Sequence, residues 1–214
     1  MKTVTFHLDF ISPYAYLAFE ALPNALAGTG AEVSYRPILF AGILKHHGQL
    51  GPAEIAPKRD WTYRQVLWHA RQHSIAFDMP SQHPFNPLGL LRLSLACGDA
   101  VSGTLSRELC AKFFRHVWLG GQAADDAERL SLLAADLGPL LSPDSAQVKA
   151  ALRTNTDTAI AQGVFGVPAF EVEGQIFWGF DALPMLRAYL LNDPFFSGPW
   201  RSAAAVGAGV VRRG

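Results

Sequence analysis

The segment TVTFHLDFISPYAYL, residues 3–17, decides how this chain begins to fold. Residues 3–10 alternate apolar and polar side chains and are rich in β-branched and aromatic types, which predicts a strand. Ser12 then stands at the expected N-cap of a helix, with Pro13 in the first turn and an apolar run behind it. A helix N-terminus favours an anion because its first amides are unpaired and its dipole is positive there. The alternative is that Ser12 only caps the helix.

After the first strand and helix, the chain is expected to form a second strand, then a long helical segment, and finally two strands and a helix. A second strand is expected at 32–37, which completes an opening β-α-β unit. From about 41 to 162 helical periodicity dominates, with helices expected at 60–74, 88–100, 103–119, 123–136 and 144–162. Strands return at 168–172 and 175–178 around a Glu173-Gly174 hairpin turn, and a last helix is expected at 182–191 with Asp181 as its cap. The sequence therefore predicts an α/β protein.

The composition narrows the class of partner. Half of the 214 residues are hydrophobic and 17% are charged, which is typical of a compact protein. Eighteen basic and eighteen acidic residues cancel, so nothing favours nucleic acid or an anionic membrane as a partner. Pro, Gly or a charge interrupts each apolar run before it reaches the length of a membrane span. Residues 1–10 resemble a strand more than a signal peptide, and we therefore expect a cytoplasmic protein.

Cysteine usage excludes dithiol chemistry at the first helix, and histidine usage argues against a metal site elsewhere. A dithiol oxidoreductase needs a reactive cysteine at the helix N-terminus and a second one three residues later, where this chain has Ser12 and Ala15. Cys97 and Cys110 match no metal or redox spacing, and we expect them to fill the core. The seven histidines include the pair His69/His73, but no HExxH pattern or acidic cluster accompanies it, so we expect no metal site.

Four motifs together resemble a known family. They are 9–14 (DFISPY), Arg36-Pro37, 163–168 (GVFGVP) and 177–181 (FWGFD). In this order they resemble the 2-hydroxychromene-2-carboxylate isomerases, which are relatives of the kappa-class glutathione transferases with a DsbA-like thioredoxin fold. The ordered set frames most of the chain, from residue 3 to about 192.

The resemblance implies a division of the chain. Segments 1–40 and 163–192 would form a thioredoxin-like domain, and 41–162 would form an inserted all-helical domain with a connecting helix. The remaining segment, 193–214, is rich in small residues and aperiodic, and we expect it to be a flexible tail.

The resemblance also implies a glutathione site around the helix N-terminus. Ser12 would donate a hydrogen bond to the glutathione thiolate and act as its stabiliser. The backbone of Val167, before a cis Pro168, would pair with the cysteinyl backbone of glutathione as an added strand does. Asp181 would bind the α-amino group, although helix capping competes as its role. Phe180 replaces a polar residue that is usual in the family and leaves only its backbone for binding.

The inserted segment would supply the remaining contacts. Gln49 stands where the family usually has an asparagine, and Lys58 where it has a lysine that contacts glutathione, so Lys58 would pair with the glycyl carboxylate. Trp61 stands near a usual tyrosine, and Asn86 lies in the substrate-side loop. The alternative for the Lys58-Arg59-Asp60 run is an ordinary solvated surface.

The activity implied by the resemblance is a glutathione-dependent isomerase. It would convert 2-hydroxychromene-2-carboxylate, or a related intermediate of aromatic degradation, to trans-o-hydroxybenzylidenepyruvate, and the family analogy adds a homodimer. One alternative is a kappa-type glutathione transferase that conjugates electrophiles. Another is a redox-inactive thioredoxin-fold module that binds extended peptides at Val167-Pro168.

Overall fold

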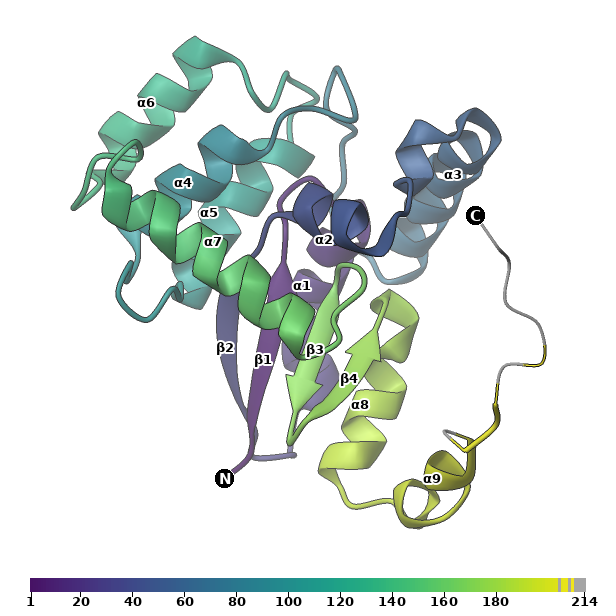
Figure 1. Ribbon diagram of the computed structural model, residues 1–214. Coiled ribbons are helices and arrows are strands. Elements are labelled where there is room, and N and C mark those ends of the chain that lie inside the picture. Colours follow the sequence, from purple (N-terminus) through teal and green to yellow (C-terminus); the bar gives the residue numbers. More distant parts are fainter. Residues whose placement is uncertain (204, 208, 210–214) are drawn as a thin grey trace.

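The computed structural model of the protein describes residues 1–203, 205–207 and 209 (Figure 1). The strands are β1 (Thr3–Leu8), β2 (Glu32–Pro37), β3 (Ala169–Val172) and β4 (Gln175–Trp178). The helices are α1 (Pro13–Leu26), α2 (Phe40–His47), α3 (Ala56–Gln72), α4 (Leu88–Cys97), α5 (Arg107–Trp118), α6 (Ala127–Leu137), α7 (Ala146–Ala161), α8 (Leu183–Leu190) and α9 (Pro199–Ala203). Short 3₁₀ turns are η1 (Pro52–Glu54), η2 (Phe180–Ala182) and η3 (Pro194–Ser197).

One mixed sheet organises the molecule. Its strand order is β2-β1-β3-β4, with β1 parallel to β2 and antiparallel to β3, and β3 antiparallel to β4. The turn between β3 and β4 is formed by Glu173 and Gly174, both at positive φ (52° and 77°), as a tight hairpin requires. The predicted strands and the order β-α-β, helices, β-β-α are confirmed.

Helices cover both faces of the sheet. Figure 1 shows α7 crossing one face, with α1 on the opposite face. The alternation within β1 sends Val4, Phe6 and Leu8 into the larger core that α1 and α8 share. The α7 face holds a smaller core in which Ala159 of α7 packs with Ala169 of β3.

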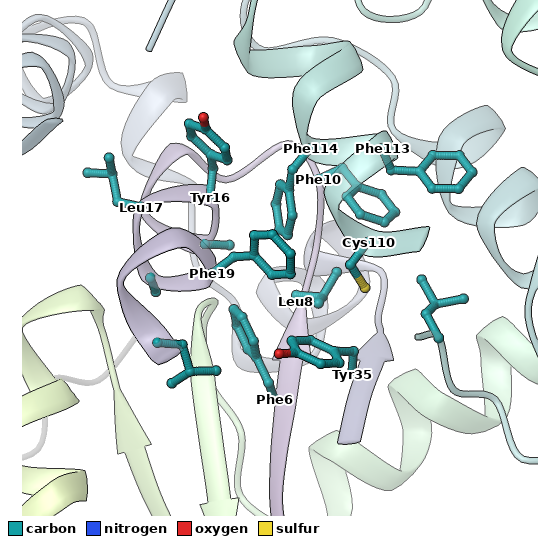
Figure 2. Packing of buried hydrophobic residues seen from close by; sticks show 14 of the residues in the cluster. Phe6, Leu8, Phe10, Tyr16, Leu17, Phe19, Tyr35, Cys110, Phe113 and Phe114 are labelled. Atoms are coloured by element: carbon teal, nitrogen blue, oxygen red, sulfur yellow. The ribbon is translucent and has the colours of Figure 1, made fainter. Parts of the chain in front are cut away.

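Aromatic side chains join α5 to the junction between β1 and α1 (Figure 2). Phe10, immediately before this junction, stacks on Phe113 with ring centroids 5.2 Å apart and meets the edge of Phe114 at 5.1 Å. Phe114 also contacts Phe19 of α1 at 5.0 Å. Cys110 of α5 is fully buried in the same core, as predicted, and burial raises the pKa of its thiol. The loop that carries Ser12 therefore rests on a rigid base.

Several predicted boundaries shift for local reasons. Helix α3 starts at Ala56 because Pro57 fits its first turn, where no amide hydrogen bond is lost. Helix α5 starts only at Arg107 because the Ser106 hydroxyl accepts from Leu109 N and caps it. The prediction that Asp181 caps the last helix is wrong, since α8 begins at Leu183 and η2 has no side-chain cap.

The first part of the C-terminal segment has more regular structure than the flexible tail that the sequence predicts. Residues from Pro194 to Ala203 form η3 and α9, and Phe196 is buried against Phe177 at a ring distance of 6.0 Å. Trp200 also stacks on Phe177, with ring centroids 5.8 Å apart, and lies 5.4 Å from the ring of Phe196. The expected tail also includes residues 204, 208 and 210–214, which lie outside the described part. Among the described helices, none has the length and apolar character needed to span a bilayer.

Candidate functional site

Ser12 lies in the short connection between β1 and α1, directly before the first residue of α1. Its backbone is extended (φ −87°, ψ 116°), and its Oγ accepts a hydrogen bond from Ala15 N at 3.2 Å, so it is the predicted N-cap. The same Oγ lies 3.5 Å from the carbonyl oxygen of Val167, and the Val167–Pro168 bond is cis, as predicted. Two motifs 155 residues apart in the sequence therefore meet at one point.

The helix end at Ser12 is electrostatically open to an anion. The first turn of α1, which lies wholly within the described residues, carries no acidic side chain. Its dipole is therefore not offset locally. The hydroxyl contact to Val167 O, at 3.5 Å, is at the outer limit of a hydrogen bond, so the Ser12 proton can turn toward a closer acceptor at little cost.

Asp9 organises the backbone before Ser12. Its Oδ1 accepts from Ile11 N at 3.1 Å, its Oδ2 from Phe40 N at 2.9 Å, and its carbonyl oxygen from Ser12 N at 3.1 Å. The side chain is fully buried, and burial raises its pKa to about 7, against the opposing effect of these amide donors. Asp9 thus links the Ser12 loop to the start of α2.

Tyr14 connects α1 to α3 beside the site. Its hydroxyl donates to Gln65 Oε1 at 2.6 Å. Burial, followed by the charge of Asp181, raises the pKa of Tyr14, so the carboxylate lies within electrostatic reach of the first turn of α1. Asp181 itself is exposed in η2. A carboxylate is thus available near Ser12 for a cationic group.

The side chain of Phe180 packs against two histidine rings at the end of α3. Its ring is buried and lies 5.3 Å from the ring of His69 and 4.9 Å from that of His73. His69 lies in the last turn of α3 and His73 is the C-cap of that helix, so Phe180 packs η2 against the C-terminal end of α3. A phenyl ring has no hydrogen-bonding group, so a backbone contact of Phe180 to a ligand stays a prediction.

The other predicted site residues are less closely gathered. Gln49, Lys58 and Trp61 are exposed, Gln49 just after α2 and the other two on α3. Within the described residues, none of the three side chains makes a hydrogen bond to Ser12. Asn86 Oδ1 accepts from Leu88 N at 3.1 Å, which gives this side chain a local role at the start of α4.

Sequence reasoning missed residues that hold the site in place. Asp9, Tyr14 and Gln65 were not singled out, nor was His83, whose ring lies 2.8 Å from Ile11 O. Only Asp9 carries a local signal, because a carboxyl group at the end of a buried strand needs donors nearby. The other contacts join distant segments and leave no trace in a short window of sequence.

Comparison with known proteins identifies the family. A family model described as a DSBA-like thioredoxin domain matches residues 3–191. The chain is 30% identical to a 2-hydroxychromene-2-carboxylate isomerase of Sphingobium xenophagum, with 89% of this chain and 99% of that protein covered. It is 28% identical to glutathione S-transferase kappa 2 of Caenorhabditis elegans, with coverages of 94% and 96%.

A solved structure agrees with this assignment at the level of the fold. The structure of a 2-hydroxychromene-2-carboxylate isomerase superposes with a TM-score of 0.71 at 22% identity, covering 96% of this chain and all of that one (100%). The predicted thioredoxin fold with helices inserted into it is thereby confirmed. The chain belongs to the DSBA-like thioredoxin-domain family, in the company of the 2-hydroxychromene-2-carboxylate isomerases and the kappa-class glutathione transferases.

Proposed function

We propose that the protein is a glutathione-dependent isomerase. Its substrate would be 2-hydroxychromene-2-carboxylate or a related intermediate of aromatic degradation, and its product trans-o-hydroxybenzylidenepyruvate or the corresponding analogue. The observation that carries the proposal is the meeting of the Ser12 hydroxyl and the Val167 carbonyl at the open N-terminus of α1. The 30% identical isomerase supports the choice of reaction.

The backbone at Val167 fits an extended peptide such as glutathione. Within the described residues, Val167 N–H has no hydrogen-bond partner, and Val167 O has only the loose contact to Ser12 Oγ. A backbone donor left without a partner in the protein is available to an added strand, which would satisfy it. Val167 and Pro168 would therefore hold the cysteinyl backbone of glutathione and present its sulfur to Ser12.

The charged groups around this point suit the two ends of the tripeptide. Asp181 would bind the α-amino group, and Lys58 on α3 would bind the glycyl carboxylate. Gln49 and Trp61 would close over the ligand from the inserted segment, and the backbone of Phe180 would add a contact. Asn86, in the loop before α4, remains the candidate on the substrate side.

The residues of the chain would act mainly on the charge of the thiol. Glutathione, when bound, would supply a thiolate that adds reversibly to the conjugated double bond of the substrate and so permits rotation about it. Ser12 Oγ–H would donate to the sulfur, and the N-terminus of α1 would add its dipole. Both effects favour the charged form and lower the thiol pKa.

The reaction is tested by following product and thiol together. The protein is incubated with the chromene substrate and a limiting amount of glutathione, and free thiol is counted at the end. Isomerisation of many substrate molecules per glutathione, with the thiol count unchanged, is the expected result. A protein that leaves the chromene unchanged in the presence of glutathione is not this isomerase.

A kappa-type transferase is the second candidate, favoured by the kappa relative that covers 94% of this chain. In that case, free thiol would disappear in step with conjugate. A peptide-binding module would show neither reaction and no saturable glutathione site. We also propose that the protein is cytoplasmic and forms a homodimer. Light scattering of the purified protein tests the homodimer, because it measures the mass of the particle in solution.

A further inference from the structure

The peptide unit between Ile11 and Ser12 is held at both ends. Its N–H, on Ser12, donates to Asp9 O at 3.1 Å. Its carbonyl, on Ile11, lies 2.8 Å from Nε2 of His83, a residue 72 positions further along the chain. Since the carbonyl can only accept, Nε2 must carry a proton. The plane that precedes Ser12 therefore has a fixed orientation.

The other side of the His83 ring reaches α3. Nδ1 of His83 lies 2.8 Å from the hydroxyl of Tyr63, and that hydroxyl also lies 2.8 Å from His83 O. In neutral His83, Nδ1 is an acceptor, so Tyr63 O–H donates to it or to the carbonyl. Tyr63 belongs to the helix that also bears Lys58 and Trp61. One imidazole thus joins the Ser12 loop to the helix proposed to bind the far end of glutathione.

The surroundings of His83 favour the neutral ring. Burial lowers its pKa, and the hydrogen bond to Ile11 O opposes this in part. Its ring also has aromatic neighbours, Trp118 at 5.6 Å and Phe85 at 6.0 Å between ring centroids. The titratable groups on the elements packed around it are Asp9 beyond Ile11, Tyr63 itself, and Arg59 and Asp60, whose charges act on Tyr63.

We propose that His83 is a positioning residue for Ser12. By holding the Ile11 carbonyl it fixes the backbone that aims the Ser12 hydroxyl, and through Tyr63 it sets where α3 lies relative to that hydroxyl. The inference rests on the proposed function, because its consequence is a properly placed donor for the glutathione sulfur. The placement of Ser12 and the placement of α3 are separate effects, so separate substitutions can distinguish them.

The test compares two amides at position 83. In His83→Gln, the side-chain amide nitrogen takes the place of Nε2 and can still donate to Ile11 O. In His83→Asn, the shorter side chain cannot reach Ile11 O. Its amide can still form a hydrogen bond with the Tyr63 hydroxyl. The thiol pKa of bound glutathione is followed by ultraviolet absorbance, and its dissociation constant by calorimetry. Thermal melts establish that each variant folds, and His83→Leu replaces His83→Asn if the latter does not.

The expected results distinguish the two hydrogen bonds of the His83 ring, the one to Ile11 O and the one to the Tyr63 hydroxyl. We expect His83→Asn to raise the pKa of the bound glutathione thiol by about one unit, which is a tenfold loss of thiolate at a pH below that pKa. We expect His83→Gln to bring the thiol pKa most of the way back to the wild-type value. Tyr63→Phe weakens binding roughly threefold, by the loss of one hydrogen bond, and leaves the thiol pKa unchanged. A thiol pKa in His83→Asn equal to that of the wild type overturns the inference alone. A wild type that binds no glutathione overturns the proposed function as well.

Discussion

Asp9 is a buried carboxyl group that makes stability depend on pH. Its pKa in the folded protein, about 7, lies above the ordinary value of 3.8 because burial disfavours its charge. Between these values the folded state binds more protons than the unfolded state, so the free energy of unfolding falls as pH rises through this window. Relative to Asp9→Asn, which cannot titrate, the wild type should lose on the order of 4 kcal/mol from about pH 4 to about pH 7.

Urea denaturation of both proteins across this window measures the difference. Because the two share every other ionisable group, the subtraction isolates Asp9. Parallel pH profiles for the wild type and Asp9→Asn would show that Asp9 is already ionised at low pH, contrary to this account.

His7 produces the opposite dependence on the other face of the sheet. It is fully buried, both ring nitrogens lack a partner among the described residues, and burial followed by the charge of Arg36 lowers its pKa to about 4. Its contribution to stability is therefore present above the ordinary value of 6.5 and lost as pH falls toward 4.

Replacing His7 by leucine should stabilise the protein. His7→Leu removes two unpaired nitrogens, and we expect the free energy of unfolding at pH 7 to rise by about 1–3 kcal/mol, with a larger gain at pH 5. Urea denaturation at both pH values checks this, with His46→Leu on the surface as the control. A His7→Leu protein less stable than the wild type at both pH values would mean that the imidazole has partners the account lacks.

Elements that depend on local chemistry were predictable. The hairpin at Glu173-Gly174 and the cap at Ser12 follow from residue types in the right positions. The start of α3 was misjudged because a proline in a first turn and a proline that breaks a helix look alike in sequence. The capping role of Asp181 was misjudged because η2 starts after Gly179, at φ 101°, without a side-chain cap.

Gly179 controls where η2 places Asp181. A side chain at this position would need an unfavourable φ and would also meet the Asp181 carboxylate. At Gly174, φ is 77° but the space is open, so Gly174→Ala carries only the backbone cost of about 1–2 kcal/mol. Gly179→Ala should be less stable than Gly174→Ala in thermal melts, and only Gly179→Ala should weaken glutathione binding in calorimetry. Equal affinities in the two variants would argue against a role for Asp181.

At the scale of the whole molecule, the C-terminal elements η3 and α9 pack against the edge strand β4 through Phe177. Phe196 is 9% exposed and Phe195 is 45% exposed, which makes the two adjacent phenylalanines a matched pair. Phe196→Ala should lower the free energy of unfolding by about 3 kcal/mol, and Phe195→Ala by well under half of that. Chemical denaturation measures both. Similar small losses in the two variants would mean that η3 and α9 are not packed as described.

The fold was predictable to a greater extent than the site. Periodicity and turn residues predicted the strands and most helices, because these signals are local. The contact between Ser12 and Val167 spans 155 positions, and that between His83 and Ile11 spans 72, so local sequence signals reveal neither. The family resemblance placed Ser12 and Val167 at one site but gave no sign of His83. Gln49, Lys58, Trp61 and Asn86 were inferred from family resemblance, and their roles stay predictions.

The most direct test of the central claim is the thiol pKa of glutathione bound to the wild type and to Ser12→Ala. Thiolate absorbance is followed against pH at saturating protein, and calorimetry confirms binding to both. The account predicts a wild-type pKa below the free-thiol value of about 8.5. In Ser12→Ala it predicts a rise of at least about one unit while glutathione still binds. The same pKa in both proteins would contradict it and leave Ser12 as a helix cap alone.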